Sequence, residues 1–173
     1  AACDIDIDYL SFMGVNNDGD FPSLAGPESV FELIRPYVEL AVKNDGTITG
    51  IRLKIVSDSG AYFVNSTPSP PYRASHRIIG PYLTPNARVD VLGVVTNKPP
   101  TGAYRGAGGP ESAFCMERTV GLIARELDLD PSEVRRRNLI PPDAFPYLTP
   151  TGLTYDSGNY EVVLDRALES ALV

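Results

Sequence analysis

The fold is decided by residues 37–57, which read YVELAVKNDGTITGIRLKIVS. Apolar side chains alternate with polar or small ones on both sides of the central Lys43-Asn44-Asp45-Gly46. A period of two predicts strands with one apolar face and one wet face, and Asn-Asp-Gly is typical of a turn between them. We therefore expect a β-hairpin over residues 37–57.

A further strand is expected over residues 88–95, where Val89, Val91, Gly93 and Val95 share one face. The sequence then changes to helical spacing. The first helix begins at Pro110, where a missing N–H costs nothing, and continues through Leu127. Strands followed by helices indicate the α+β class.

Two more helices are expected after the first. Asp130-Pro131-Ser132-Glu133 is an N-capping signal, and the helix that it starts ends in Arg135, Arg136 and Arg137, which suit the negative end of a helix dipole. The third helix places Tyr160 and Ala171 at the two ends of one apolar face. The complete expectation is an antiparallel hairpin plus a further strand, packed with about three helices.

Two regions look irregular. Residues 1–35 carry scattered Asp residues among Gly, Asn and Ser, and we expect an acidic irregular leader, with the folded domain over residues 36–173. Residues 65–85 are rich in proline and contain Arg73, His76 and Arg77. We expect this stretch to be a long ordered loop, the kind of segment where function is often found.

Composition excludes several classes of protein. The 173 residues contain 15 Lys and Arg against 22 Asp and Glu, a net charge of -7 without a basic run, so binding to nucleic acid is not expected. No apolar stretch approaches the roughly 18 residues that a membrane span needs. With one histidine, His76, and no Cys-x-x-Cys pair, we expect no metal site made of side chains. We expect a cytoplasmic protein.

Residues 101–111, TGAYRGAGGPE, join the expected strand to the first helix. Glycines allow a ligand to approach the backbone, the helix N-terminus favours an anion, and Arg105 can add hydrogen bonds. The loop does not end in the Gly-Lys-Ser/Thr of a Walker A motif, and Glu111 stands where a dinucleotide fingerprint has its third glycine. A tight turn without a ligand is the alternative that these residues leave open.

The stretch from Pro99 to Gly108, followed by Pro110-Glu111, resembles the cofactor loop of molybdenum hydroxylase large subunits. That family includes xanthine dehydrogenase, aldehyde oxidoreductase and the large chain of aerobic carbon monoxide dehydrogenase. The resemblance continues through residues 135–141 and 155–158. It implies contacts to a molybdenum-bound pyranopterin, often in a cytosine dinucleotide form, and the cofactor-binding residues that it implies are Ala103, Tyr104, Arg105, Gly106, Ala107 and Gly108.

The resemblance also bears on substrate. Arg73 matches by spacing the arginine that purine-hydroxylating members direct at substrate, which makes it a candidate catalytic residue; a surface arginine is the alternative. Carbon monoxide oxidisers have a copper-holding Cys where this chain has Gly106, and purine oxidisers have a stacking Phe where it has Ala107. The resemblance therefore argues against carbon monoxide as the substrate and against the aromatic clamp that holds a purine ring.

Length limits what the chain does alone. Large subunits of this family are several times longer, and their general base, a Glu, lies beyond any residue matched here. We expect a fragment or split subunit of an aldehyde or N-heterocycle hydroxylase that is not catalytically complete. The expected partners are the remainder of the large subunit and iron–sulfur and flavin subunits or domains. We expect self-association and no cofactor in the isolated chain; the alternative is an orphan self-associating interaction domain.

Overall fold

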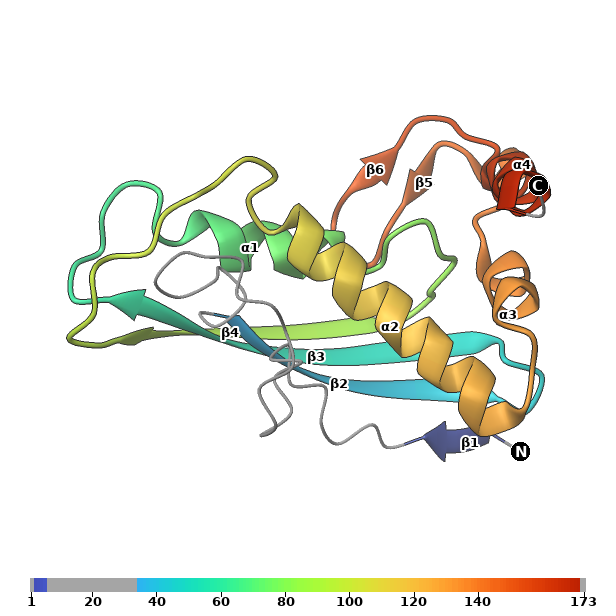
Figure 1. Cartoon of the computed structure of the whole chain (residues 1–173), viewed down its shortest axis with the longest axis horizontal. Helices are drawn as coiled ribbons and strands as arrows, with labels where there is room; N and C mark the ends of the chain where they lie inside the picture. Colours follow the sequence, from blue (N-terminus) through green and yellow to red (C-terminus); the bar gives the residue numbers. More distant parts are fainter. Residues whose placement is uncertain (1, 6–33, 172–173) are drawn as a thin grey trace.

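A four-stranded sheet lies along one side of the molecule (Figure 1). The computed structural model describes residues 2–5 and 34–171. The strands are β1 (Ala2–Ile5), β2 (Ile34–Lys43), β3 (Ile48–Gly60) and β4 (Ala87–Val95), in that spatial order. The first three are antiparallel, whereas β4 runs parallel to β3.

The hairpin predicted over residues 37–57 is confirmed as β2 and β3. Val38 pairs with Leu53 and Leu40 with Ile51, so the alternating apolar residues meet on one face. Lys43 and Thr47 close the turn with a hydrogen bond of 2.9 Å, in which the Thr47 carbonyl accepts. The opposite face of the sheet carries the Arg52–Glu39 and Arg88–Asp90 ion pairs.

The proline-rich stretch is not the loop that the sequence predicted, because it contains helix α1 (Ser69–Arg77). Pro70 and Pro71 lie in the first turn, where their missing N–H groups leave no hydrogen bond unmade. Parallel strands need a crossover between them, and α1 provides it for β3 and β4. His76 is therefore a helical residue and not a loop residue.

The three later helices are confirmed as α2 (Gly109–Leu127), α3 (Pro131–Asn138) and α4 (Tyr160–Ala171). The Asp130 side chain caps α3 by accepting from the N–H groups of Ser132 and Glu133 at 2.7 and 3.2 Å. Between α3 and α4 the chain forms a 3₁₀ turn (Pro142–Ala144) and a small sheet of β5 (Tyr147–Leu148) and β6 (Thr154–Tyr155). The α+β prediction is thus confirmed.

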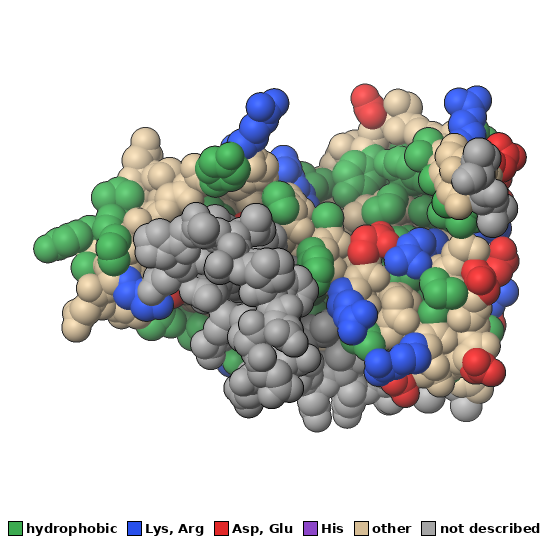
Figure 2. All heavy atoms as spheres, in the orientation of Figure 1, with side chains coloured by type: hydrophobic (Ala, Val, Ile, Leu, Met, Phe, Trp, Pro, Cys, Tyr) green, Lys and Arg blue, Asp and Glu red, His purple; other side chains and the backbone are tan. Residues whose placement is uncertain are grey.

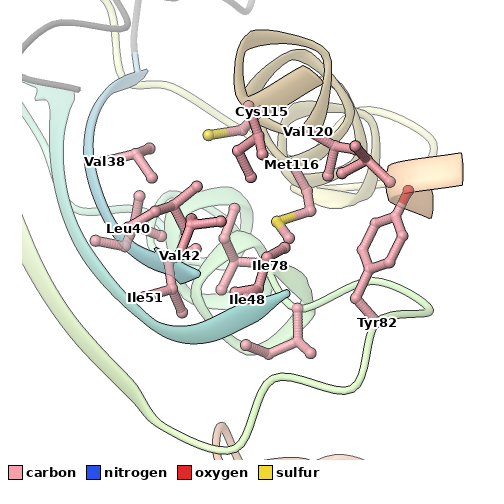
Figure 3. Packing of buried hydrophobic residues seen from close by; sticks show 14 of the residues in the cluster. Val38, Leu40, Val42, Ile48, Ile51, Ile78, Tyr82, Cys115, Met116 and Val120 are labelled. Atoms are coloured by element: carbon pink, nitrogen blue, oxygen red, sulfur yellow. The ribbon is translucent and has the colours of Figure 1, made fainter. Parts of the chain in front are cut away.

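The core lies between the sheet and the helices α1 and α2. Figure 3 shows Cys115, Met116 and Val120 of α2 pointing toward side chains of β2 and β3. Burial raises the pKa of the Cys115 thiol to about 12, so this cysteine behaves as a small apolar residue. The apolar face of α4, in contrast, contains no buried residue.

The division at residue 35 stays a prediction. Strand β1 and the start of β2 fall inside the expected leader, whereas residues 6–33 lie outside the described residues. None of the helices that the structure describes is long and apolar enough to cross a membrane.

Candidate functional site

The glycine loop, residues 101–108, joins β4 to α2 and ends against α1. Gly108 has φ 86°, and a Cβ there would lie 2.2 Å from the Pro70 carbonyl oxygen and 2.6 Å from the Ala74 nitrogen. Real Cβ atoms essentially never come this close to backbone atoms. Only glycine therefore allows the loop to lie this close to α1.

The loop is held at both of its ends. The buried Thr67 hydroxyl donates to the Thr101 carbonyl at 2.8 Å, and within the loop Ala107 N–H donates to the Tyr104 carbonyl at 2.9 Å. Gly106 has φ 101° and Ala107 φ 35°, values that turn the chain into the start of α2. The loop therefore has a defined shape before any ligand binds.

The middle of the loop is exposed to solvent. Ala103, Tyr104, Arg105 and Gly106 are exposed, Ala107 is half-buried and Gly108 is buried. The backbone N–H groups of residues 103–106 make no hydrogen bond with any residue that the structure describes. The Arg105 guanidinium likewise has no hydrogen bond or ion pair within residues 34–171. The loop thus presents several unused donors on one exposed turn.

Arg73 lies on α1, directly before Ala74, whose backbone contacts the glycine loop. Its side chain is exposed and has no hydrogen-bond or ion-pair partner among the described residues. The structure therefore places Arg73 on the helix that supports the loop.

Two polar residues near the start of α2, Glu111 and Arg77, were not among the site residues expected from the sequence. Glu111, in the first turn of α2, is only 6% exposed, and its Oε2 has no hydrogen-bond partner in the described part of the chain. Arg77 follows Arg73 by one helical turn, and its Nη1 would lie 3.1 Å from a Cβ added at Gly109. The i, i+4 spacing of Arg73 and Arg77 would have indicated a shared face if α1 had been expected.

The three consecutive arginines of α3 are excluded as ligand-binding groups. Arg135 Nε donates to Glu117 Oε2 at 2.8 Å, and Arg136 pairs with Glu161 and Asp165 at 3.1 and 2.7 Å. Arg137 donates to the Asp45 carbonyl. The Tyr82 hydroxyl also donates to Glu117, and burial together with this carboxylate raises the pKa of Tyr82. These contacts fix α3 and α4 to the domain.

No group of three or more metal-ligating side chains is found in residues 2–5 and 34–171. A family model, the molybdopterin cofactor-binding domain, matches residues 34–139, which is more than half of the chain. The chain belongs to the molybdopterin cofactor-binding domain family.

Individual relatives agree with this family. The chain is 39% identical over 135 residues to the carbon monoxide dehydrogenase large chain of Hydrogenophaga pseudoflava, covering 76% of this chain and 17% of that protein. It is 34% identical over 139 residues to the gamma subunit of the 6-hydroxypseudooxynicotine dehydrogenase complex of Paenarthrobacter nicotinovorans, covering 78% and 18%. The chain thus spans less than a fifth of these relatives.

A solved structure gives the same result. Quinoline 2-oxidoreductase from Pseudomonas putida 86 superposes with a TM-score of 0.75 at 31% identity, covering 80% of this chain and 18% of that one. The molybdopterin-binding region represented here is therefore partial.

The glycine loop fits the family's cofactor. Phosphate and carbonyl oxygens are acceptors, and the loop offers unused backbone N–H groups and an unpaired guanidinium. At Gly106 a Cβ would lie 3.0 Å from the Pro110 Cδ on a backbone with φ 101°. The backbone at this position favours glycine, and because residue 106 is glycine the chain has no thiolate there.

Proposed function

We propose that this chain supplies part of the pyranopterin cradle of a molybdenum hydroxylase that acts on aldehydes or N-heterocycles. The observation that carries the proposal is the exposed turn of the glycine loop, with its unused donors, inside a domain of the molybdopterin-binding family. The bound cofactor would supply the redox chemistry. The protein residues described next hold and orient it.

Within the cradle, the backbone N–H groups of residues 103–106 donate to cofactor oxygens, and Arg105 forms charge-assisted hydrogen bonds to phosphate. Ala107 and Gly108 fix the turn against α1. The same donors suit a cytosine dinucleotide form, which carries a second phosphate. The nucleotide released by acid from the purified complete subunit distinguishes the two forms.

Arg73 is proposed to contact the substrate. Two observations support this role. Arg73 extends from α1, the helix that the glycine loop contacts, and no described residue neutralises its charge. Ala107 has only a methyl side chain, so the loop offers no aromatic ring at this position to clamp a purine. The absence of a thiolate at Gly106 argues against carbon monoxide as the substrate.

The complete enzyme is proposed to contain the remainder of the large subunit together with iron–sulfur and flavin subunits or domains, and to be cytoplasmic. The isolated chain is proposed to hold no cofactor and to self-associate, because apolar side chains on β4, including Val91, Leu92 and Val95, are exposed. An orphan interaction domain is not favoured, since the family match covers the loop that would then have no role.

The test compares Arg105→Ala with Arg118→Ala in a complete large subunit that contains this sequence. Arg118 is an exposed arginine of α2 without a partner among the described residues. Losing a bidentate contact should cost about 1.5–3 kcal/mol of cofactor affinity, so molybdenum and pterin content should fall in Arg105→Ala only. Equal content in the two variants would contradict the role of Arg105.

A further inference from the structure

A hollow borders the start of α2. It has a volume of about 400 Å³ and lies between the end of α1, the first two turns of α2 and β6. Met116, Pro81 and Leu153 make its apolar surface, and Met116 is almost fully buried. Hydrophobic side chains also gather over β5 and β6 beside it (Figure 2). Its volume is within the range of small-molecule sites.

One wall of the hollow contains an arginine side chain without a described partner. Arg77 lines it, and its guanidinium has no hydrogen bond or ion pair with any residue in 34–171. The missing side chain at Gly109 makes room for this guanidinium, whose Nη1 would lie 3.1 Å from a Cβ at that position. Arg77 therefore presents its donors over an apolar floor.

The other wall carries Tyr155, a half-buried residue of β6. Burial raises the pKa of its phenol, and the nearby charge of Arg77 works against that rise. The hydroxyl thus remains protonated at neutral pH and is available as a donor. The ring adds a flat apolar surface on which an aromatic group can pack.

Among the described residues, the lining of the hollow contains one cation, Arg77, and one carboxylate, Glu117. Glu117 is the one carboxylate among the residues described as lining it, and it is already bonded to Arg135 and to the Tyr82 hydroxyl. The one carboxylate that lines the hollow in the described structure therefore already has partners other than Arg77.

We propose that this hollow, the Arg77 groove, binds the carboxylate of a small aromatic acid. The guanidinium of Arg77 donates two hydrogen bonds to the planar carboxylate, with the Tyr155 hydroxyl as an additional donor. The aromatic ring lies on Pro81 and Leu153, above the buried Met116. The groove requires no cofactor, so this site is independent of the proposed function, although both sites share the first turn of α2.

The test uses the isolated chain and benzoate, with chemical-shift titration as the readout. Benzamide, of the same shape but neutral, and acetate, charged but without a ring, are the matched ligands. We expect saturable benzoate binding with a Kd near about 1 mM, and at least about tenfold weaker binding of each of the other two. Shifts should concentrate at Gly109, Met116 and residues 153–155.

Variants assign the binding to named groups. Arg77→Met should weaken benzoate about tenfold and leave benzamide unchanged, whereas Arg118→Met should change neither. Tyr155→Phe should weaken benzoate about twofold to fivefold. All three substitutions are at exposed or half-buried positions and should leave the unfolding midpoint close to that of the unmodified chain.

Several results would overturn the proposal. These are equal affinity for benzoate and benzamide, equal affinity for benzoate and acetate, an unchanged affinity in Arg77→Met, and no saturation by about 10 mM benzoate. The last result would leave an acidic side chain of the remaining large subunit as the occupant of the groove. None of these results bears on the molybdenum content of the complete subunit.

Discussion

The β2–β3 hairpin and the glycine loop use their backbone hydrogen-bonding groups in opposite ways. In the hairpin, strand pairing on both sides of β3 occupies the backbone, and its side chains fill the core. In the loop, residues 103–106 leave their N–H groups unused, although Gly108 and Thr101 are firmly held. The comparison shows that a loop can be rigid at its ends and still keep donors for a ligand.

The largest effect is expected from Gly108→Ala, which would remove the rigid end of the loop. The new methyl would lie within 2.6 Å of two α1 backbone atoms, so either the loop or α1 must move. We expect a loss of at least about 3 kcal/mol in the free energy of unfolding, measured with urea. Gly152→Ala, with φ 88° and open space around it, is the control and should cost about 1 kcal/mol.

The second-largest loss in the free energy of unfolding is expected at Asn138, which holds the turn of the hairpin. Asn138 of α3 accepts from Ile48 N–H and donates to the Gly46 and Val134 carbonyls, each at 2.8 Å, in a buried site. Asn138→Ala leaves these groups unpaired and should cost about 2–3 kcal/mol in the same urea experiment. The exposed Asn97→Ala should be near neutral. A small effect at Asn138 would mean that the hairpin turn holds without α3.

A smaller effect, visible as a pH dependence, is expected at Asp58, where β3 and β4 end. Hydrogen bonds from Thr96 and Gly60 and the charge of Lys98 lower the pKa of Asp58 below its ordinary 3.8. A lowered folded-state pKa stabilises the protein above about pH 3.8, and this contribution disappears as the pH falls through the lowered value.

Asp58→Asn should therefore flatten the stability profile between about pH 5 and pH 2, measured by thermal unfolding. Asp143→Asn, at an exposed carboxylate without a hydrogen bond or ion pair to the described residues, is the matched control and should keep the slope of the unmodified chain. Identical slopes for both variants would show that Thr96 does not bond to the ionised Asp58.

The smallest effect is expected from Arg105→Ala in the isolated chain. An exposed guanidinium without a partner contributes little to folding, so unfolding free energy should change by no more than about 0.5 kcal/mol. Arg135→Ala, which breaks the pair with Glu117, is the positive control and should lower the midpoint. A clear fall in Arg105→Ala would mean that Arg105 braces the loop and is not reserved for a ligand.

Sequence patterns predicted the elements whose signals are local. The alternation of apolar and polar residues predicted the hairpin. The helical spacing after Pro110 predicted α2, and the N-cap at Asp130 predicted α3. The parallel pairing of β4 was not predicted, because alternation describes the faces of a strand and not its neighbour. Helix α1 was missed because Pro70 and Pro71 look like loop residues, although the first turn of a helix tolerates them.

For the candidate sites too, the sequence predicted what is local and missed what depends on tertiary packing. Residues 103–108 are contiguous, so one motif was sufficient to name them, and their contact with the cofactor stays a prediction. The Arg77 groove combines α1, α2 and β6, segments separated by up to 78 positions between Arg77 and Tyr155. No single stretch of sequence carries that juxtaposition, since it depends on how α1 packs.

The contact between Gly108 and α1 also constrains the order of folding. The hairpin closes a short segment and can form early, whereas β4 can pair with β3 only after the crossover has folded back across the sheet. Because Gly108 packs against α1, we expect the glycine loop to take its shape last, when α1 and α2 meet. In a mutational analysis of folding kinetics, we expect substitutions in the hairpin to slow folding and substitutions in the loop mainly to speed unfolding, that is, kinetic φ-values near 1 and near 0. A cofactor would therefore find its site only on a chain whose folding is essentially complete.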